Sequence, residues 1–283
     1  MEEALAKIRP HTSSSLAHQK TPANLLIAIE STFGEQNTEA TPTAYFAAIL
    51  TTLDGTIQKQ DVSLDEGAIL PAELYLLALV TPFVSAPVIR SNLDTLLSLT
   101  SPFFPALNHC APALRSQLAI YQSIFKSLDR SQLEVQSVRQ SFASILHLSV
   151  DPRPKVRKKA ADLIRDLLAH PPTPLLRHPY SERVAEWIKK TLTEAGAMPF
   201  GKGKATVPGA EVAIHLLAFL KPIISNLPPE VRWRSYFCIL TYSHVVYACH
   251  HESAFNASTS GKHVPFSIIL LSHGRRLFCL DRG

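Results

Sequence analysis

Glycine is scarce in this chain of 283 residues, where it occurs 10 times, about half of its usual share of ~7%. Common nucleotide-binding folds hold phosphates in glycine-rich loops, and tight β-hairpin turns also depend on glycine. The scarcity therefore argues against both classes. The one Asp-Gly pair, Asp54-Gly55, lies between two helix-like segments, and no stretch sustains the alternation of apolar and polar residues that is typical of a strand. We expect an all-α protein.

Cysteine is rare as well, with four residues at irregular spacing: Cys110, Cys238, Cys249 and Cys279. That number is too small for a disulfide framework in a chain of this length. Charged residues make up only 18% of the chain and hydrophobic residues 46%, which favours a large core over disorder. The acidic start Met1-Glu2-Glu3 has no apolar run behind it, so we expect no secretory signal and an intracellular, reducing compartment.

Long uninterrupted apolar runs are missing. The most apolar stretch, residues 68–89, contains Glu73, Pro82 and Pro87, whereas a membrane-spanning helix needs ~20 mostly apolar residues. We interpret this stretch as a buried helix pair and expect no membrane association.

Charge is unevenly distributed along the chain, behind a net charge of +5. Residues 1–100 carry 5 Lys and Arg against 11 Asp and Glu, a net of −6, whereas residues 101–230 carry 17 against 10, a net of +7. Residues 231–283 carry 6 against 2, a net of +4. Such asymmetry suggests that an acidic end and a basic middle meet different partners.

Proline is abundant, with 21 residues, and it punctuates the chain between apolar segments. Thr21-Pro22 and Thr41-Pro42 each combine a threonine that can cap a helix with a proline at the first helical position. Apolar residues spaced by three and four predict helices over residues 23–33, 43–53, 72–80, 88–99, 113–128, 131–148, 155–167, 181–195 and 207–224.

The predicted helices form pairs. Those that begin near Ala113 and Lys155 start 42 residues apart, within the ~40–47-residue period of HEAT and armadillo repeats. A single pair cannot bury its apolar face alone, so the pairs must stack. The sequence therefore predicts a HEAT-type α-solenoid fragment over residues 1–230.

Three strings carry a family resemblance: Arg-Pro-His-Thr-Ser-Ser-Ser-Leu-Ala-His-Gln at 9–19, Thr-Pro-Thr-Ala-Tyr-Phe-Ala-Ala at 41–48, and Asp-Pro-Arg-Pro-Lys-Val-Arg-Lys-Lys-Ala-Ala at 151–161. They resemble the ribosomal RNA processing protein 12 family, over about residues 1–230. In the HEAT pattern Asp151 ends an inter-helix turn, where it can cap helix N–H groups, and Val156-Arg157 open the second helix.

The resemblance implies a non-enzymatic scaffold of the nucleus and nucleolus. It implies a role in the maturation and nuclear export of pre-ribosomal particles, with pre-ribosomal RNA, assembly factors, Ran and karyopherins as partners. It brings no catalytic residue and no cofactor. Family members are several times longer than this chain.

The densest basic cluster supplies the candidate RNA-binding residues, which are Arg153, Lys155, Arg157, Lys158, Lys159 and Arg165. Clustered cations can contact RNA phosphates. The alternative is a solvated helix face with local ion pairs such as Lys158–Asp162, and the repeat position of Arg157 favours a structural role. Aromatic residues are not interleaved with the cations, so stacking on single-stranded bases is not indicated.

Composition changes at Val231. The last 53 residues hold three of the four cysteines and five of the twelve histidines. A small zinc domain is one interpretation, but the segment has no closely spaced cysteine pair. We favour an atypical, poorly ordered tail at 231–283 that arises from a translated intron.

Other motifs do not support an enzyme. Gly196-Ala-Met-Pro-Phe-Gly201-Lys202-Gly203 departs from a phosphate-binding loop at its last position and follows a helix where the motif needs a strand, so we expect a basic inter-helix loop. His109-Cys110 lacks a third partner for hydrolysis and is interpreted as structural. We expect no metal, no cofactor and no small-molecule substrate. The competing function is a transport-type or adaptor solenoid that binds proteins only.

Overall fold

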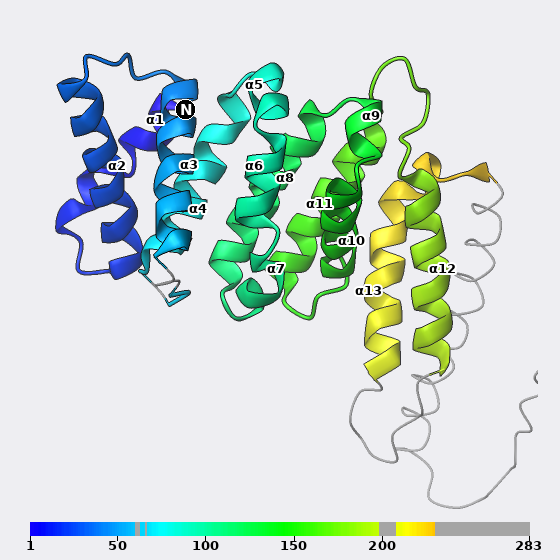
Figure 1. Ribbon diagram of the computed structural model, residues 1–283. Coiled ribbons are helices and arrows are strands. Elements are labelled where there is room, and N and C mark those ends of the chain that lie inside the picture. Colours follow the sequence, from blue (N-terminus) through cyan, green and yellow to red (C-terminus); the bar gives the residue numbers. More distant parts are fainter. Residues whose placement is uncertain (60–62, 66, 198–207, 230–283) are drawn as a thin grey trace, which may run out of the picture. The chain divides into compact units, whose positions relative to one another are not determined.

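The structure is a computed structural model that describes residues 1–59, 63–65, 67–197 and 208–229 (Figure 1). Within these residues every regular element is a helix, so the all-α prediction is confirmed. None of these helices is both long and apolar enough to cross a membrane. The predicted loop at 196–203, except its first two residues, and the tail at 231–283 lie outside the described residues.

The helices have the following bounds, with η marking short 3-10 helices: α1 Glu2–Ala6, η1 Arg9–Ser13, α2 Ala17–Glu35, α3 Pro42–Gln58, α4 Ile69–Val80, η2 Thr81–Phe83, α5 Ala86–Ser91, α6 Leu93–Thr100, α7 Phe103–Ala106, η3 Leu107–His109, α8 Ala111–Ser127, α9 Arg130–Leu133, α10 Gln136–Leu148, α11 Pro154–Ala169, α12 Ser181–Ala197, α13 Pro208–Ile223 and η4 Ile224–Asn226.

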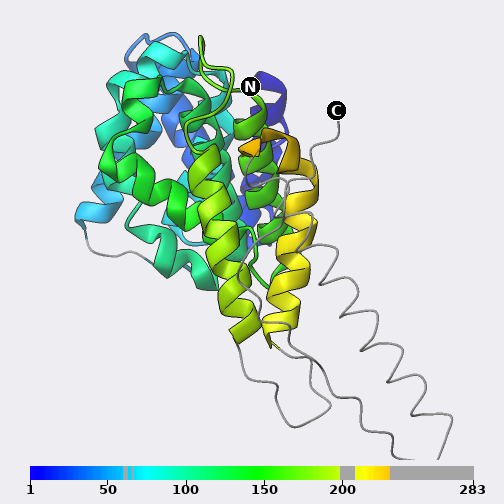
Figure 2. The ribbon, with the colours of Figure 1, turned by 90° about the vertical axis from the view of Figure 1, so that its right-hand side faces the viewer.

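The helices up to α13 pack in two layers. α2, α4, α8, α11 and α13 form one layer, in which each helix packs on the next in chain order. α3 packs on α4, α10 on α11 and α12 on α13, which adds a second layer. Figure 2 shows α12 and α13 running antiparallel, side by side. This is the paired arrangement that the helix spacing predicts.

The core follows the predicted helical faces. On α8 the predicted face of Leu114, Leu118, Tyr121 and Phe125 is buried. On α11 every apolar residue of the predicted face is buried too. Burying a Leu or Phe side chain contributes ~1.5–3 kcal/mol, so these faces hold the layers together. Val135 is an exception: it is 41% exposed because it lies between α9 and α10, where the helix predicted over 131–148 is broken.

Two predicted helix starts have different outcomes. Thr41 caps α3 as expected, since its hydroxyl oxygen accepts a hydrogen bond from the Ala44 N–H at 3.2 Å. The prediction for Thr21 is wrong, because α2 already begins at Ala17 and Pro22 lies inside it. The Thr21 hydroxyl instead donates to the Gly67 carbonyl oxygen at 2.7 Å. It thereby ties α2 to the loop that leads into α4.

Asn92 interrupts the helix predicted over 88–99. The segment forms α5 and α6, with Asn92 at φ −103° and ψ 13° between them. Its side-chain amide donates to the Val88 carbonyl oxygen at 2.9 Å. Asparagine competes with the helix in this way because its side chain hydrogen-bonds nearby backbone groups. The apolar spacing alone predicts one continuous helix and therefore misses this break.

Candidate nucleic-acid interface

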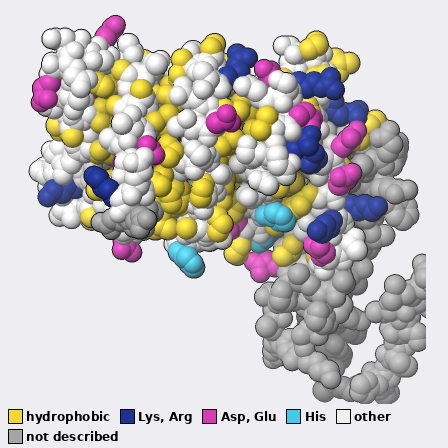
Figure 3. Space-filling view, viewed as in Figure 1, with side chains coloured by type: hydrophobic (Ala, Val, Ile, Leu, Met, Phe, Trp, Pro, Cys, Tyr) yellow, Lys and Arg dark blue, Asp and Glu magenta, His cyan; other side chains and the backbone are white. Residues whose placement is uncertain are grey.

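The basic cluster lies on and just before α11. Pro154 opens the helix, where its missing N–H costs nothing, and Arg153 precedes it. The buried face of α11 packs against α8 and α10, so spacing places most of the cations on the remaining faces. On the face seen in Figure 3, most Lys and Arg side chains lie over the part of the molecule built by α9 to α13. This agrees with the basic middle found in the sequence.

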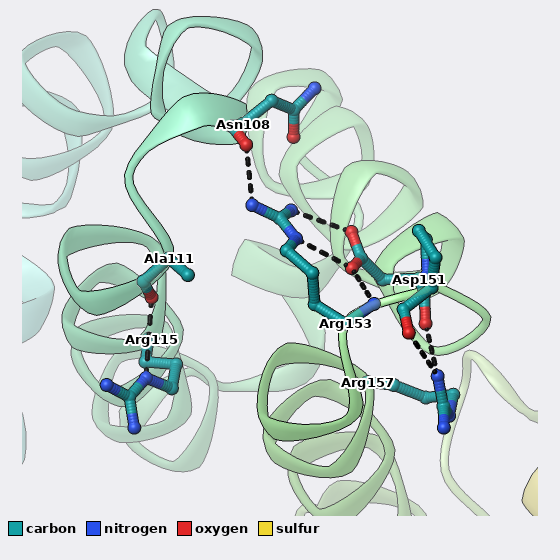
Figure 4. Close-up of polar contacts among 7 residues, drawn as sticks. Asn108, Ala111, Arg115, Asp151, Arg153 and Arg157 are labelled. Carbon is teal, nitrogen blue, oxygen red and sulfur yellow. Dashed lines mark hydrogen bonds and ion pairs between the residues drawn. The ribbon is translucent and has the colours of Figure 1, made fainter.

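Arg153 is tied into the fold (Figure 4). Its Nε and Nη2 donate to the Asp151 carboxylate at 2.9 and 2.8 Å, and its Nη1 donates to the Asn108 carbonyl oxygen at 2.5 Å. Burial alone would raise the pKa of the Asp151 carboxyl, but the hydrogen bonds and charge of Arg153 outweigh it and the pKa is lowered. Such a paired arginine joins the α10–α11 turn to η3 and has fewer donors left for a phosphate.

Asp151 does not cap the helix in the expected way. Its carboxylate accepts from the backbone N–H of Arg153 at 2.8 Å, a residue before the first turn of α11. The side chain thus stabilises the turn and not the helical N–H groups, because an aspartate readily binds the backbone two residues onward. The expected capping of α11 by Asp151 is therefore wrong.

Arg157 also stabilises this turn. Its Nη1 donates to the carbonyl oxygens of Asp151 and Pro152 at 2.6 and 3.0 Å (Figure 4). These contacts agree with the structural role that its repeat position favours. Its other guanidinium donors make no hydrogen bond within the described residues, so the side chain can serve the turn and still present charge.

Lys159 faces α8. Its Nζ donates to Gln122 Oε1 at 3.0 Å, and the Gln122 amide in turn donates to Asp166 at 3.0 Å. Lys126 Nζ lies 2.6 Å from the same Asp166 carboxylate. Burial would raise the pKa of Asp166, but the bonds from Lys126 and Gln122 lower it. Lys159 thus belongs to a polar network between two helices.

Asp162 does not pair with Lys158. Its carboxylate lies 2.9 Å from Arg165 Nη2, one turn later on α11, so the expected Lys158–Asp162 pair is wrong. Lys155 and Lys158 are exposed, and neither makes a hydrogen bond or ion pair within the part of the chain that the structure describes. These two ammonium groups are therefore the cations of the cluster most available to a ligand.

A groove of ≈260 Å³ between α11 and α13 joins part of the cluster to a residue that the sequence reasoning missed. Arg157, Lys158 and Arg165 line it from α11, and His215 lines it from α13. Burial, followed by the charge of Arg157, lowers the pKa of His215. His215 stands some fifty residues along the chain from the cluster, and only the packing of the two helices connects them.

Three guanidinium or ammonium groups with one carboxylate, Asp162, give this groove a net positive charge among the described residues. An anion of the size of a phosphodiester could bind there through charge-assisted hydrogen bonds.

No group of three or more metal-ligating side chains occurs in the described ranges. His109 ends η3, and Cys110, a partly exposed free thiol, lies between η3 and α8.

Comparison with known proteins places this chain in a family. The model for RRP12-like, N-terminal HEAT repeats matches residues 7–250, which extends 20 residues beyond Glu230. Ribosomal RNA-processing protein 12 of Saccharomyces cerevisiae is 28% identical over 202 residues, covering 68% of this chain and 16% of the yeast protein. RRP12-like protein of Gallus gallus is 25% identical over 265 residues, covering 88% of this chain and 19% of the chicken protein.

The human RRP12-like protein is 24% identical over 265 residues, covering 87% of this chain and 18% of its own length. The chain thus spans less than a fifth of these three relatives. No solved structure matches it. The helix pairs and the family model agree on a HEAT-type α-solenoid fragment, as the sequence predicts. The chain belongs to the RRP12-like family, in the region of its N-terminal HEAT repeats.

Proposed function

We propose that this chain is a non-enzymatic scaffold in ribosome biogenesis, which supports pre-ribosomal RNA processing and the assembly or nuclear export of pre-ribosomal particles. The observation that carries the proposal is the family match over residues 7–250, together with relatives named for ribosomal RNA processing. A stack of helix pairs offers long surfaces and no catalytic constellation among the described residues, which suits a scaffold. The nucleus and nucleolus are the corresponding locations.

RNA contact is the second part of the proposal. Lys155 and Lys158 lie free of protein partners in the described chain, and the α11–α13 groove adds Arg157, Arg165 and His215. The phosphate backbone supplies most of the affinity of such contacts, since each neutralised phosphate releases counterions. Arg153 and Lys159 contribute less to RNA binding in this proposal, because their donors already form hydrogen bonds within the protein.

A salt titration of RNA binding tests this proposal. The affinity for a fluorescent RNA hairpin is measured at several salt concentrations for the wild type and for Lys155→Glu with Lys158→Glu. Each phosphate contact contributes a slope of about −0.9 in log affinity against log salt, so removing two should reduce the slope by about 1.8. Helicity should stay unchanged, because both side chains are exposed.

Lys20→Glu with Lys189→Glu is the matched control, since it removes the same charge from exposed sites on α2 and α12. An equal loss in both double variants would mean that only net charge matters, and would contradict this site. Undetectable RNA binding by the wild type would favour the other function, an adaptor solenoid that binds proteins only.

Ran and karyopherins are proposed as partners alongside assembly factors. A pull-down from nuclear extract with the tagged chain, with and without a locked GTP form of Ran, tests this. Ran-dependent retention of karyopherins is the expected result, and retention of neither would remove them from the proposal.

A further inference from the structure

A larger groove lies between η1, α2, α4 and α8, and no residue of the basic cluster lines it. Its volume is ≈1160 Å³, above the ~300–1,000 Å³ usual for small-molecule pockets and large enough for an extended segment of polypeptide. Its helices α2, α4 and α8 belong to the same layer as α11 and α13, but the two grooves share no lining residue. The proposed RNA contacts leave this groove without a function.

Small and apolar residues form much of its lining. They are Ala68, which precedes α4, Ala72 and Ala78 on α4, and Ala113 and Ala119 on α8. Small side chains bring the helix backbones close to any ligand and leave space above them. Tyr75 lines the same groove and is 41% exposed, an apolar ring left partly in water.

Charged and imidazole side chains complete the lining. Arg115 is half-buried on α8, and its one hydrogen bond in the described chain is a long one, 3.4 Å from Nε to the Ala111 carbonyl oxygen. No carboxylate pairs with Arg115 among the described residues. Figure 4 shows it turned away from the Asp151–Arg153 pair. The planar donors of such an arginine match a carboxylate in two-point fashion.

Three histidines, His11, His18 and His109, line the groove with Arg115, and His11 and His109 can donate hydrogen bonds to an acidic ligand. Asp65 is the one carboxylate among the described residues that line the groove. Lys7 also lines it, but its Nζ lies 2.7 Å from Glu3. The groove therefore complements acidic groups, although residues 1–100 as a whole are acidic.

RNA fits this groove less well. A nucleic-acid backbone needs a series of lysines and arginines along its path, and only Arg115 here is free of a carboxylate partner in the described residues. The apolar floor offers nothing to a phosphate, whereas it would bury aliphatic side chains. One unpaired guanidinium beside an apolar floor suits a peptide that carries both kinds of group.

We propose that the α2–α4–α8 groove binds an extended acidic peptide of a protein partner. One carboxylate of the peptide pairs with Arg115, and its alternating aliphatic side chains lie on the alanine floor and against Tyr75. The proposal goes beyond the scaffold function, and it gives the chain separate surfaces for protein and for RNA.

Fluorescence anisotropy with three labelled probes tests it: a peptide alternating Glu and Leu, a peptide alternating Lys and Leu, and an oligouridylate. The wild-type chain should bind the Glu-Leu peptide at least ten-fold more tightly than the Lys-Leu peptide. Arg115→Glu should weaken this binding at least ten-fold. Ser116→Phe, which places a ring in the groove without changing charge, should weaken it to a similar extent.

Arg130→Glu is the matched charge reversal, because Arg130 is exposed on α9 and does not line the groove. It should leave peptide binding unchanged, as should the double reversal of Lys155 and Lys158. Circular dichroism of each variant verifies that it is folded. The proposal is overturned if the Glu-Leu peptide fails to bind, if both groove variants bind it normally, or if oligouridylate displaces it.

Discussion

At the scale of single residues, Glu73 is the most unusual side chain in the described core. It is 1% exposed on α4, and its Oε1 accepts a hydrogen bond from the Thr56 hydroxyl at 2.9 Å, while Oε2 has no partner. Burial raises its pKa to about 7, against the weaker opposing effect of the Thr56 and Thr52 hydrogen bonds. A carboxyl placed this way favours its neutral form.

The Glu73 pKa predicts a pH-dependent stability. Because the folded pKa is raised from 4.5 to about 7, the contribution is fully present below pH 4.5 and is lost as the pH rises through 7. The total is about 3 kcal/mol at ~1.4 kcal/mol per pKa unit. Glu73→Gln should therefore gain stability over the wild type at pH 8 and match it near pH 4.5. Urea unfolding at the two pH values measures the difference, and an equal difference at both would contradict this origin.

At the scale of elements, the α10–α11 turn is held by side chains and not by a helix cap. Asp151 binds the Arg153 guanidinium and backbone, and Arg157 binds two carbonyl oxygens of the turn. Through Asn108 the same unit reaches η3 at the start of α8. One carboxylate therefore sets the geometry of a turn between two layers.

Removal of that carboxylate should loosen the turn. Asp151→Ala leaves the half-buried Arg153 without its partner, so we expect a loss of about 2 kcal/mol. Lys155→Ala, four residues away and exposed, should change stability by less than about 0.5 kcal/mol. Thermal melts of the two variants make the comparison. Equal melting temperatures for Asp151→Ala and the wild type would mean that the turn does not depend on this pair.

At the scale of the whole described array, stability should be nearly one-dimensional. Each helix pair packs chiefly on its neighbours in the chain, so damage at one end has few direct contacts through which to reach the other. Leu26 on α2 and Ile188 on α12 are both 1% exposed and serve as matched probes of the two ends.

Leu26→Ala and Ile188→Ala should each cost about 2–5 kcal/mol through the cavity they leave. Hydrogen exchange should show protection lost mainly in the altered helix pair and its nearest neighbour. Uniform loss across α2 to α12 in either variant would show instead that the array unfolds as one unit.

The sequence by itself determined most of the long helices and their pairing, because period and proline position act locally. The faces of α8 and α11 and the cap at Thr41 follow directly from residue spacing. The breaks at Asn92 and before Val135 were missed, since a few local hydrogen bonds decide them against a continuous apolar pattern. The start of α2 was missed as well: the helix begins at Ala17, and the Thr21 hydroxyl binds Gly67, 46 residues away, and caps no helix.

Only the tertiary structure decided what each cation of the candidate site does. Along the chain Arg153, Lys155, Lys158 and Lys159 have similar side chains in similar positions. In the folded chain Arg153 is hydrogen-bonded to Asp151 and Lys159 to Gln122, whereas Lys155 and Lys158 have no partner in the described chain. Packing also brings His215 of α13 beside the cluster on α11. In the separate α2–α4–α8 groove, packing places Arg115 beside several alanines. Sequence spacing fixes which face of a helix a side chain occupies, but the neighbouring helix decides which groups meet it there.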